Sequence, residues 1–180
     1  MALLSIAFAL TIPSLREFFR GRVLDSEARR LLSLTRYAQS RAISEGVPMI
    51  LWIDGIEGRY GLEAAAGFLE EDGRAIEFKV DPLLEMEASE PPRADPLSMR
   101  PEEAMLTGLG AVPGWGIADR GRSRLGLPRI SFLPDGYLGE TSPEYIVLRQ
   151  GGESAVWLTQ STNRLLYELR SEAPSPYRIW

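Results

Sequence analysis

The sequence predicts a protein of the α+β class, in which one long N-terminal helix is followed by an antiparallel β-sandwich. Apolar residues recur at the three- or four-residue spacing of a helix as far as Gly46. From Val47 onward the spacing changes to the two-residue alternation of strands. Short strand-like runs separated by turn residues then follow, as is typical of antiparallel sheets. The 180 residues are enough for one globular unit, residues 47–180, with the helix as an appendage, residues 1–46.

The predicted helix begins with a strongly apolar run. Residues 2–12 contain only one serine and one threonine among apolar residues, and no charge occurs before Arg16. Such a run is too short to span a bilayer by itself, because a spanning helix needs about 20 apolar residues. Pro13 lies inside the pattern, where we expect it to kink the helix without ending it.

The second half of the helix is predicted to be amphipathic and to pack on the sheet. Its apolar stripe consists of Leu24, Ala28, Leu31, Thr35, Ala38 and Ala42. Most of its charged residues are expected off that stripe, namely Asp25, Glu27, Arg29, Arg30, Arg36 and Arg41. Gly46 is the expected C-cap, and Pro48 prevents the helix from continuing.

The first twenty residues carry apolar side chains on every side of the helix, so we expect them to need lipid or neighbouring helices. No basic residue precedes the apolar run, and the helical pattern continues beyond it, so we do not expect cleavage by ordinary signal peptidase. The predicted membrane and assembly surface consists of Leu3, Leu4, Ile6, Phe8, Leu10, Ile12, Pro13, Leu15, Phe18 and Phe19.

Three strands are expected directly after the helix. The first, residues 47–53, has apolar residues on both faces and should be buried on both. A turn at residues 54–58 leads into a second strand at 59–64, which forms a hairpin with the first. The third, residues 76–80, alternates apolar and charged residues and is predicted to be half-buried.

Residues 81–127 are rich in glycine and proline, and we expect a long irregular excursion there without strands, apart from a possible helical turn at 101–106. Order is expected to return in four strands that form a second sheet or the second half of one. These strands are predicted at 129–133, 145–149, 155–160 and 165–170. The proline-interrupted tail should lie on the surface.

The chain contains neither cysteine nor histidine, and this excludes several classes of site. Disulfides, cysteine nucleophiles and a serine–histidine–aspartate triad are impossible, while zinc and haem sites lose their usual ligands. The glycine-rich residues 108–116 lack the third glycine and the strand–helix context of a dinucleotide loop, and Ser123 lacks the spacing of a nucleophile elbow. We therefore predict no catalytic residues, no cofactor and no metal site.

Two groups of charged residues remain. We interpret the acidic residues Glu70, Glu71, Asp72, Glu85, Glu87 and Glu90 as solvated turns, because they lack the spacing of a calcium loop. The one concentrated basic patch consists of Arg120, Arg122, Arg124 and Arg129, near Trp115. A nucleic-acid strand could stack and pair there, but a net charge of −5 argues against this, and we do not expect nucleic acid as a partner.

Three segments together resemble the minor pseudopilins of type II secretion, specifically the H-type (GspH/FimT) family. They are IAFALTIPSLREFFRGR at 6–22, EARRLLSLTRYAQSRAISEGVPMILWID at 27–54 and ISFLPDG at 130–136. The resemblance covers both ends of the chain and leaves residues 81–127 unmatched. It implies a pilin-like fold in which the helix first spans the bacterial inner membrane and then packs inside a short filament, below a periplasmic β domain.

The resemblance also implies a role. Family members are structural subunits at the tip of the pseudopilus, a hetero-oligomeric filament that supports protein export across the outer membrane. Other pseudopilins, inner-membrane secretion components and membrane lipid would be the partners, and methylation is a family property. The alternative within the family is a minor type IV pilin used for pilus assembly, adhesion or DNA uptake. A membrane-tethered periplasmic enzyme or ligand-binding module is the alternative from another class, and it would need a polar pocket among residues 81–127.

The start of the chain departs from the family pattern. The basic leader, the glycine–phenylalanine processing site and the following glutamate are not in this sequence, and about nine apolar residues would be needed to complete a span. Arg16, Arg20 and Arg22 follow the apolar run, which would orient it against the positive-inside rule. We expect a misassigned start codon, a shortened chain or a member that has lost processing.

Overall fold

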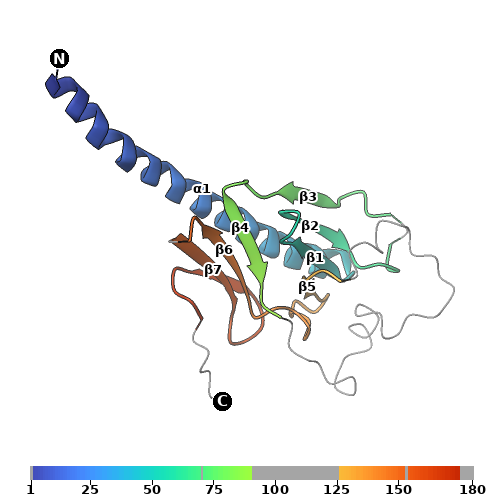
Figure 1. Cartoon of the computed structure of the whole chain (residues 1–180). Coiled ribbons are helices and arrows are strands. Elements are labelled where there is room, and N and C mark those ends of the chain that lie inside the picture. Colours follow the sequence, from blue (N-terminus) through green and yellow to red (C-terminus); the bar gives the residue numbers. More distant parts are fainter. Residues whose placement is uncertain (1, 70, 91–125, 153, 175–180) are drawn as a thin grey trace.

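The structure is a computed structural model that describes residues 2–69, 71–90, 126–152 and 154–174, with side chains described from residue 21 onward. A single helix, α1 (Ala2–Glu45), forms the N-terminal part and continues through Pro13 without interruption (Figure 1). Gly46 follows with a φ of 65°, a conformation that glycine adopts without steric cost, and so provides the expected C-cap. The kink at Pro13 stays a prediction.

Two four-stranded antiparallel sheets follow the helix. The first has the order β3 (Ile76–Lys79), β2 (Arg59–Ala64), β1 (Met49–Asp54), β5 (Arg129–Phe132). The second has the order β4 (Leu84–Ala88), β6 (Tyr145–Gln150), β7 (Ser154–Gln160), β8 (Tyr167–Arg170). The predicted α+β class, with one helix followed by antiparallel sheets, is confirmed.

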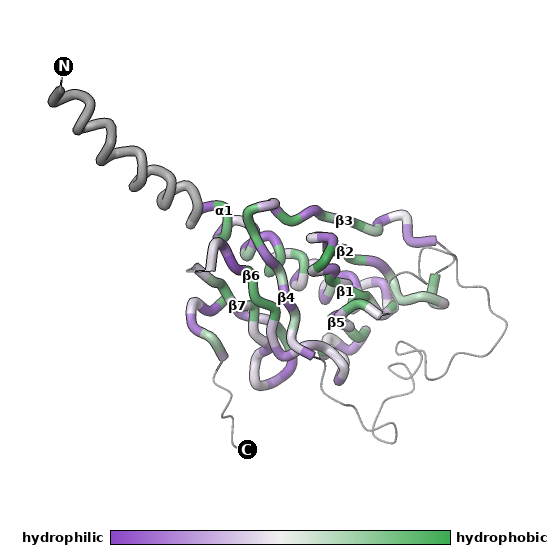
Figure 2. The backbone as a smooth tube through the Cα atoms, viewed as in Figure 1, coloured by the Kyte–Doolittle hydropathy of each residue, from purple (hydrophilic) through white to green (hydrophobic). Residues whose placement is uncertain are grey.

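One apolar core joins α1 to both sheets. Alternate residues of each strand point into it, for example Met49, Leu51 and Ile53 of β1 and Ile146 and Leu148 of β6. Figure 2 shows hydrophobic residues along β1 and β6, where these strands lie beside the helix. On the other face of β1, Ile50 packs in a second small cluster with Ala65 and Leu133. The prediction that the first strand is buried on both faces is confirmed.

The expectation of no strand within residues 81–127 is wrong for β4. Leu84 and Met86 are buried while Glu85 and Glu87 are exposed, so this segment has the two-residue alternation of a half-buried strand. The prolines and glycines around it obscured that alternation in the sequence. β4 pairs with β6 in the second sheet, with Leu84 opposite Gln150 and Ala88 opposite Ile146. The possible helical turn at 101–106 lies outside the described residues.

The order of strands along the chain is not their order in the sheets. β4 leaves the first sheet for the second, and β5 returns to the first sheet beside β1, with Met49 opposite Phe132. The four later strands were predicted to stay together, and this grouping is wrong for β5. β1 thus has a hydrogen-bonded neighbour on each side, β2 and β5, and it is the most buried strand of the first sheet.

Candidate assembly helix and its attachment to the β domain

The helix α1 has two halves with different surroundings. Residues 2–20 extend beyond the β domain as a free-standing helix of about 28 Å, whereas residues 21–45 lie against it (Figure 1). This second half contacts β1, β5, β6, β7 and β8, and therefore both sheets. The predicted assembly residues from Leu3 to Phe19 belong to the free-standing half, and their side chains lie outside the described ones.

The predicted apolar stripe attaches the second half to the sheets. Its six members, Leu24, Ala28, Leu31, Thr35, Ala38 and Ala42, are all buried, which confirms the stripe. Three of them are alanines with almost no exposed surface, so the helix backbone approaches the sheets closely. Thr35 satisfies its hydroxyl within the helix by donating to the carbonyl oxygen of Leu32 at 2.7 Å. The helix is thus part of the core of the β domain.

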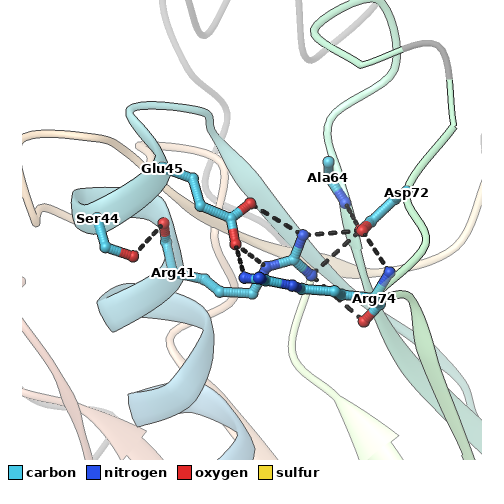
Figure 3. A network of polar contacts seen from close by, with 6 residues as sticks. All are labelled: Arg41, Ser44, Glu45, Ala64, Asp72 and Arg74. Carbon is cyan, nitrogen blue, oxygen red and sulfur yellow. Dashed lines mark hydrogen bonds and ion pairs between the residues drawn. The ribbon is translucent and has the colours of Figure 1, made fainter.

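A buried ion network connects the C-terminal end of α1 to the loop before β3 (Figure 3). The side chain of Arg41 is only 4% exposed. Its guanidinium donates to Glu45 at 2.9 and 3.1 Å on one side and to Asp72 at 2.8 and 3.2 Å on the other. Asp72 also accepts hydrogen bonds from the backbone N–H groups of Ala64 at 2.8 Å and Arg74 at 2.9 Å. A single carboxylate thereby holds the helix, the end of β2 and the loop together.

The protonation states of this network are fixed by its hydrogen bonds. Burial alone would raise the pKa of Asp72, but the hydrogen bonds from Arg41 and from the two backbone N–H groups outweigh burial and lower it. The hydrogen bond from Arg41 likewise lowers the pKa of Glu45. The pKa of Arg41 is raised, chiefly by its hydrogen bond to Glu45. All three groups are charged at neutral pH, so the attachment is ionic.

A second polar cluster joins the middle of α1 to β2. The hydroxyl of Tyr60 donates to Glu27 Oε1 at 2.7 Å and accepts from Arg30 Nε at 2.9 Å. Arg30 also pairs with Glu27 and lies over the ring of Phe78, with 4.9 Å between its guanidinium carbon and the ring centroid. Burial is the first cause that raises the pKa of Tyr60, and the hydrogen bond to Glu27 adds to it. The phenol therefore stays protonated and serves as a donor.

Gln39 attaches the helix to the loops on its other side. Its amide nitrogen donates to the carbonyl oxygens of Gly136 at 2.7 Å and Leu165 at 2.6 Å. These two carbonyls belong to the loop after β5 and the loop before β8, one from each sheet. Polar contacts thus hold α1 on both flanks of its apolar stripe.

Three charged residues differ from their predicted environments. Glu27 and Arg41 were expected off the apolar stripe and Asp72 in a solvated turn, but the side chains of all three are at least nine-tenths buried. Each is buried because it is paired and hydrogen-bonded, as buried charges must be. Arg41 follows Glu27 by 14 residues, which places both on the same flank of the helix. That spacing of opposite charges beside the apolar stripe was the available sequence signal.

The opposite face of α1 is exposed. On this face an arginine recurs every seven residues, and so does a serine. The residues are Arg22, Arg29 and Arg36 with Ser26, Ser33 and Ser40. Arg29 pairs with Asp25 at 2.8 Å, an exposed contact that contributes little to stability. This face confirms the predicted amphipathic character of residues 21–45.

The predicted basic patch is described only at Arg129. This residue is half-buried in β5, opposite Trp52 of β1, and burial lowers its pKa. Arg120, Arg122 and Arg124 lie outside the described residues. Of the acidic residues interpreted as solvated, Glu71, Glu85, Glu87 and Glu90 are exposed, whereas Glu70 lies outside the described residues.

Two further properties concern the described residues only. In them, no three acidic, cysteine or histidine side chains come together in a way that could hold a metal ion. The described part of the helix likewise contains no stretch with both the length and the apolarity needed to cross a bilayer.

Comparisons with known proteins give similarity in structure alone. No protein-family model and no curated protein sequence matches the chain. The solved structure of the minor pseudopilin EpsH from the type 2 secretion system of Vibrio cholerae is similar, with a TM-score of 0.52 and 13% identity over 85% of this chain and 99% of that one. The type IV minor pilin FimU of Pseudomonas aeruginosa has a TM-score of 0.50 and 16% identity over 84% and 97% of the two chains. The predicted pilin-like α+β fold is therefore confirmed.

Proposed function

We propose that this protein is a minor pseudopilin, a structural and non-enzymatic subunit of the filament of a type II secretion system. The observation that carries the proposal is the division of α1, with one half built into the core of the β domain and the other free-standing. The similarity in fold to a minor pseudopilin over 85% of this chain and 99% of that one supports it.

The division of α1 suits storage in a membrane and assembly into a filament. The apolar residues of the free-standing half would be stable in lipid and equally stable against apolar helices of other subunits. Exchange between these environments would need no rearrangement of the β domain, because the buried stripe and both ion clusters lie beyond residue 20. In this proposal the apolar half is part of a single-pass anchor in the bacterial inner membrane, with the β domain in the periplasm.

Gene deletion and complementation test the proposal. Removing the gene should abolish export of secreted proteins into the medium, and the unaltered gene should restore it. Leu10→Arg should fail to restore export while the protein remains folded, because it places a charge in the apolar half. Leu166→Arg is the matched control, since Leu166 is an exposed residue of the β domain. Normal export after deletion, or full complementation by Leu10→Arg, would contradict the proposal.

A minor type IV pilin is the second candidate, because the similarity to FimU is of nearly the same extent. Deletion would then impair pilus-dependent adhesion or DNA uptake and leave protein export intact. The basic patch gives a biochemical test of the same alternative. DNA binding at low salt that is lost when Arg120, Arg122 and Arg124 are replaced by alanine would favour the pilin. Absence of DNA binding in the unaltered protein would favour the pseudopilin.

A further inference from the structure

One end of the β domain surrounds the point where α1 emerges. The C-terminal end of α1 is bound through Arg41 and Asp72 to Ala64, which pairs with Met49 at the start of β1. Near the end of β1, Ile53 pairs with Tyr60, whose hydroxyl contacts Glu27, 14 residues earlier in the helix. β1 therefore runs back along α1, and the turn that follows it lies toward the free-standing half.

A second turn lies next to it at the same end. The backbone N–H of Val80 donates to the carbonyl oxygen of Gly58 at 2.8 Å, and Arg30 of the helix donates to the carbonyl oxygen of Lys79 at 3.3 Å. The turn between β3 and β4 is therefore adjacent to the turn between β1 and β2. Figure 1 shows the β3–β4 turn beside α1, where the helix leaves the domain.

Both turns present a large apolar side chain to solvent. Ile56 is 96% exposed and Leu83 is 60% exposed. Each turn is held by an aspartate, because Asp54 Oδ1 accepts from the N–H of Glu57 and Asp81 Oδ1 accepts from the N–H of Leu83, both at 2.9 Å. Turn positions are ordinarily polar. An isoleucine and a leucine on two adjacent turns therefore indicate that this end of the β domain lies in an apolar environment.

We propose that these two turns rest on the bilayer, with Ile56 and Leu83 entering its interfacial layer. This inference rests on the proposed function, in which the apolar half of α1 is in the membrane. From Gly21 the helix needs only six residues, about 9 Å, to reach the uncharged run that ends at Leu15. The headgroup layer is about 5–7 Å thick on each side, so the two turns would lie at its outer edge, from which the Ile56 and Leu83 side chains can enter it.

The charged residues around the turns are of both signs. Asp54, Glu57 and Asp81 lie in or next to the turns, but the exposed Arg59 and Lys79 flank them, so the turns do not require an anionic lipid. Ile56 and Leu83 add apolar area at the interface and would limit how far the domain tilts about the helix. The alternative to be tested is that another copy of the chain, in place of lipid, covers the same two side chains in a filament.

Site-specific fluorescence tests the proposal on the whole chain of 180 residues, which has no native cysteine to interfere. An environment-sensitive fluorophore is attached to Ile56→Cys, Leu83→Cys, Phe8→Cys or Ile43→Cys. Each labelled protein is reconstituted in a separate sample of phosphatidylcholine nanodiscs, with nitroxides at either shallow or deep positions of the lipid. Ile43 is the matched control, because it is an apolar residue 55% exposed near the other end of α1.

Shallow nitroxides should quench the labels at 56 and 83 about twofold more than the label at 43, and deep nitroxides should quench the label at 8. Quenching at 8 with equal values at 56, 83 and 43 would overturn the contact and leave the membrane anchor standing. Absence of quenching at 8 would overturn the contact together with the anchor of the proposed function. Blue-shifted emission at 56 and 83 without lipid quenching would show burial against a second protein and would also overturn it.

Discussion

Arg41 and Asp72 lie 31 positions apart in the chain, and their ion pair is the most buried charge contact among the described residues. Asp72 is satisfied from three directions, by the guanidinium and by two backbone N–H groups. An asparagine could not reproduce this arrangement, because its amide nitrogen would face donors. The carboxylate therefore determines how the end of α1 is seated on the first sheet.

Asp72→Asn should lower the free energy of unfolding by about 2–3 kcal/mol, because it leaves Arg41 buried with only part of its pairing. Chemical unfolding followed by circular dichroism at pH 7 measures the difference. Glu71→Gln is the matched control, since the neighbouring Glu71 is exposed, and it should leave stability unchanged. Equal stability of Asp72→Asn and the unaltered protein would show that the pair contributes nothing net.

The same carboxylate predicts a dependence of stability on pH. The pKa of Asp72 is lowered in the folded protein, so its contribution is fully present above the pKa of an ordinary aspartate and is lost as pH falls through the folded value. Below about pH 4 the stability difference between the unaltered protein and Asp72→Asn should shrink. Urea unfolding of both proteins at pH 7 and pH 3 checks this, and a difference that is constant with pH would contradict it.

Tyr60 offers a test of the second cluster at the level of one oxygen atom. Tyr60→Phe removes the donor to Glu27 and the acceptor for Arg30, while the ring stays in the core. We expect a loss of about 1–3 kcal/mol in the free energy of unfolding, because the buried Glu27 then keeps only Arg30 as a partner and loses the hydroxyl donor. Tyr37→Phe is the control, on an exposed tyrosine of α1. A thermal midpoint that is equal for the two variants would refute the assigned role.

At the scale of elements, the pairing of β1 with β2 depends on one close approach. Trp52 lies opposite Gly61, and a β carbon at Gly61 would come within 2.5 Å of the indole ring and 2.6 Å of the carbonyl oxygen of Ile76. Gly61 is thus the one position of β2 at which the outer-face tryptophan can lie across the hairpin. The sequence showed a glycine in a strand but not the ring that covers it.

Gly61→Ala should therefore destabilise the protein by about 1–3 kcal/mol, because the indole and the backbone of β3 must both move. Differential scanning calorimetry measures the shift in melting temperature. Gly73→Ala is the matched control, since a β carbon there would have no neighbour within 4 Å in the part of the chain that the structure describes. Equal melting temperatures for the two variants would show that the tryptophan moves away without cost.

Most elements of this fold could be predicted from local pattern, and β4 shows where such prediction stops. The helix, the three strands after it and the four closing strands are all present near their expected positions. β4 carries the alternation of a strand, but a proline precedes it closely and a glycine- and proline-rich region follows. Its partner strand β6 lies far along the chain, since the paired residues Glu87 and Arg149 are 62 positions apart. No local turn motif in the sequence could therefore predict the pairing.

At the scale of the whole molecule, the residues proposed for assembly and the residues that stabilise the β domain lie in different parts of the chain. The buried stripe, the two ion clusters and the contacts of Gln39 all lie at or beyond Leu24. The protein can therefore change the surroundings of its first twenty residues while its β domain remains the same.

A fragment of residues 21–180 should accordingly fold by itself. Its melting temperature should lie within about 2 °C of that of the whole chain in detergent, because the core is unchanged. Size-exclusion chromatography should show a monomer without detergent, whereas the whole chain should need detergent or lipid. A fragment of residues 32–180, which lacks Leu24, Ala28 and Leu31, is the contrasting variant and should unfold. Failure of the 21–180 fragment to unfold cooperatively would contradict the division of α1.

The elements of this protein and the apolar faces that they bury follow from local patterns in the amino-acid sequence. Helical spacing, strand alternation and the glycine at the C-cap are local properties, because each follows from backbone geometry within a few residues. The sheet that each strand joins and the charges that are buried depend instead on contacts between distant parts of the chain. Glu27, Arg41 and Asp72 look like surface residues in the sequence, since what makes their burial possible is a partner in another element. The same is true of Ile56 and Leu83, whose position beside the emerging helix depends on β1 running back along α1.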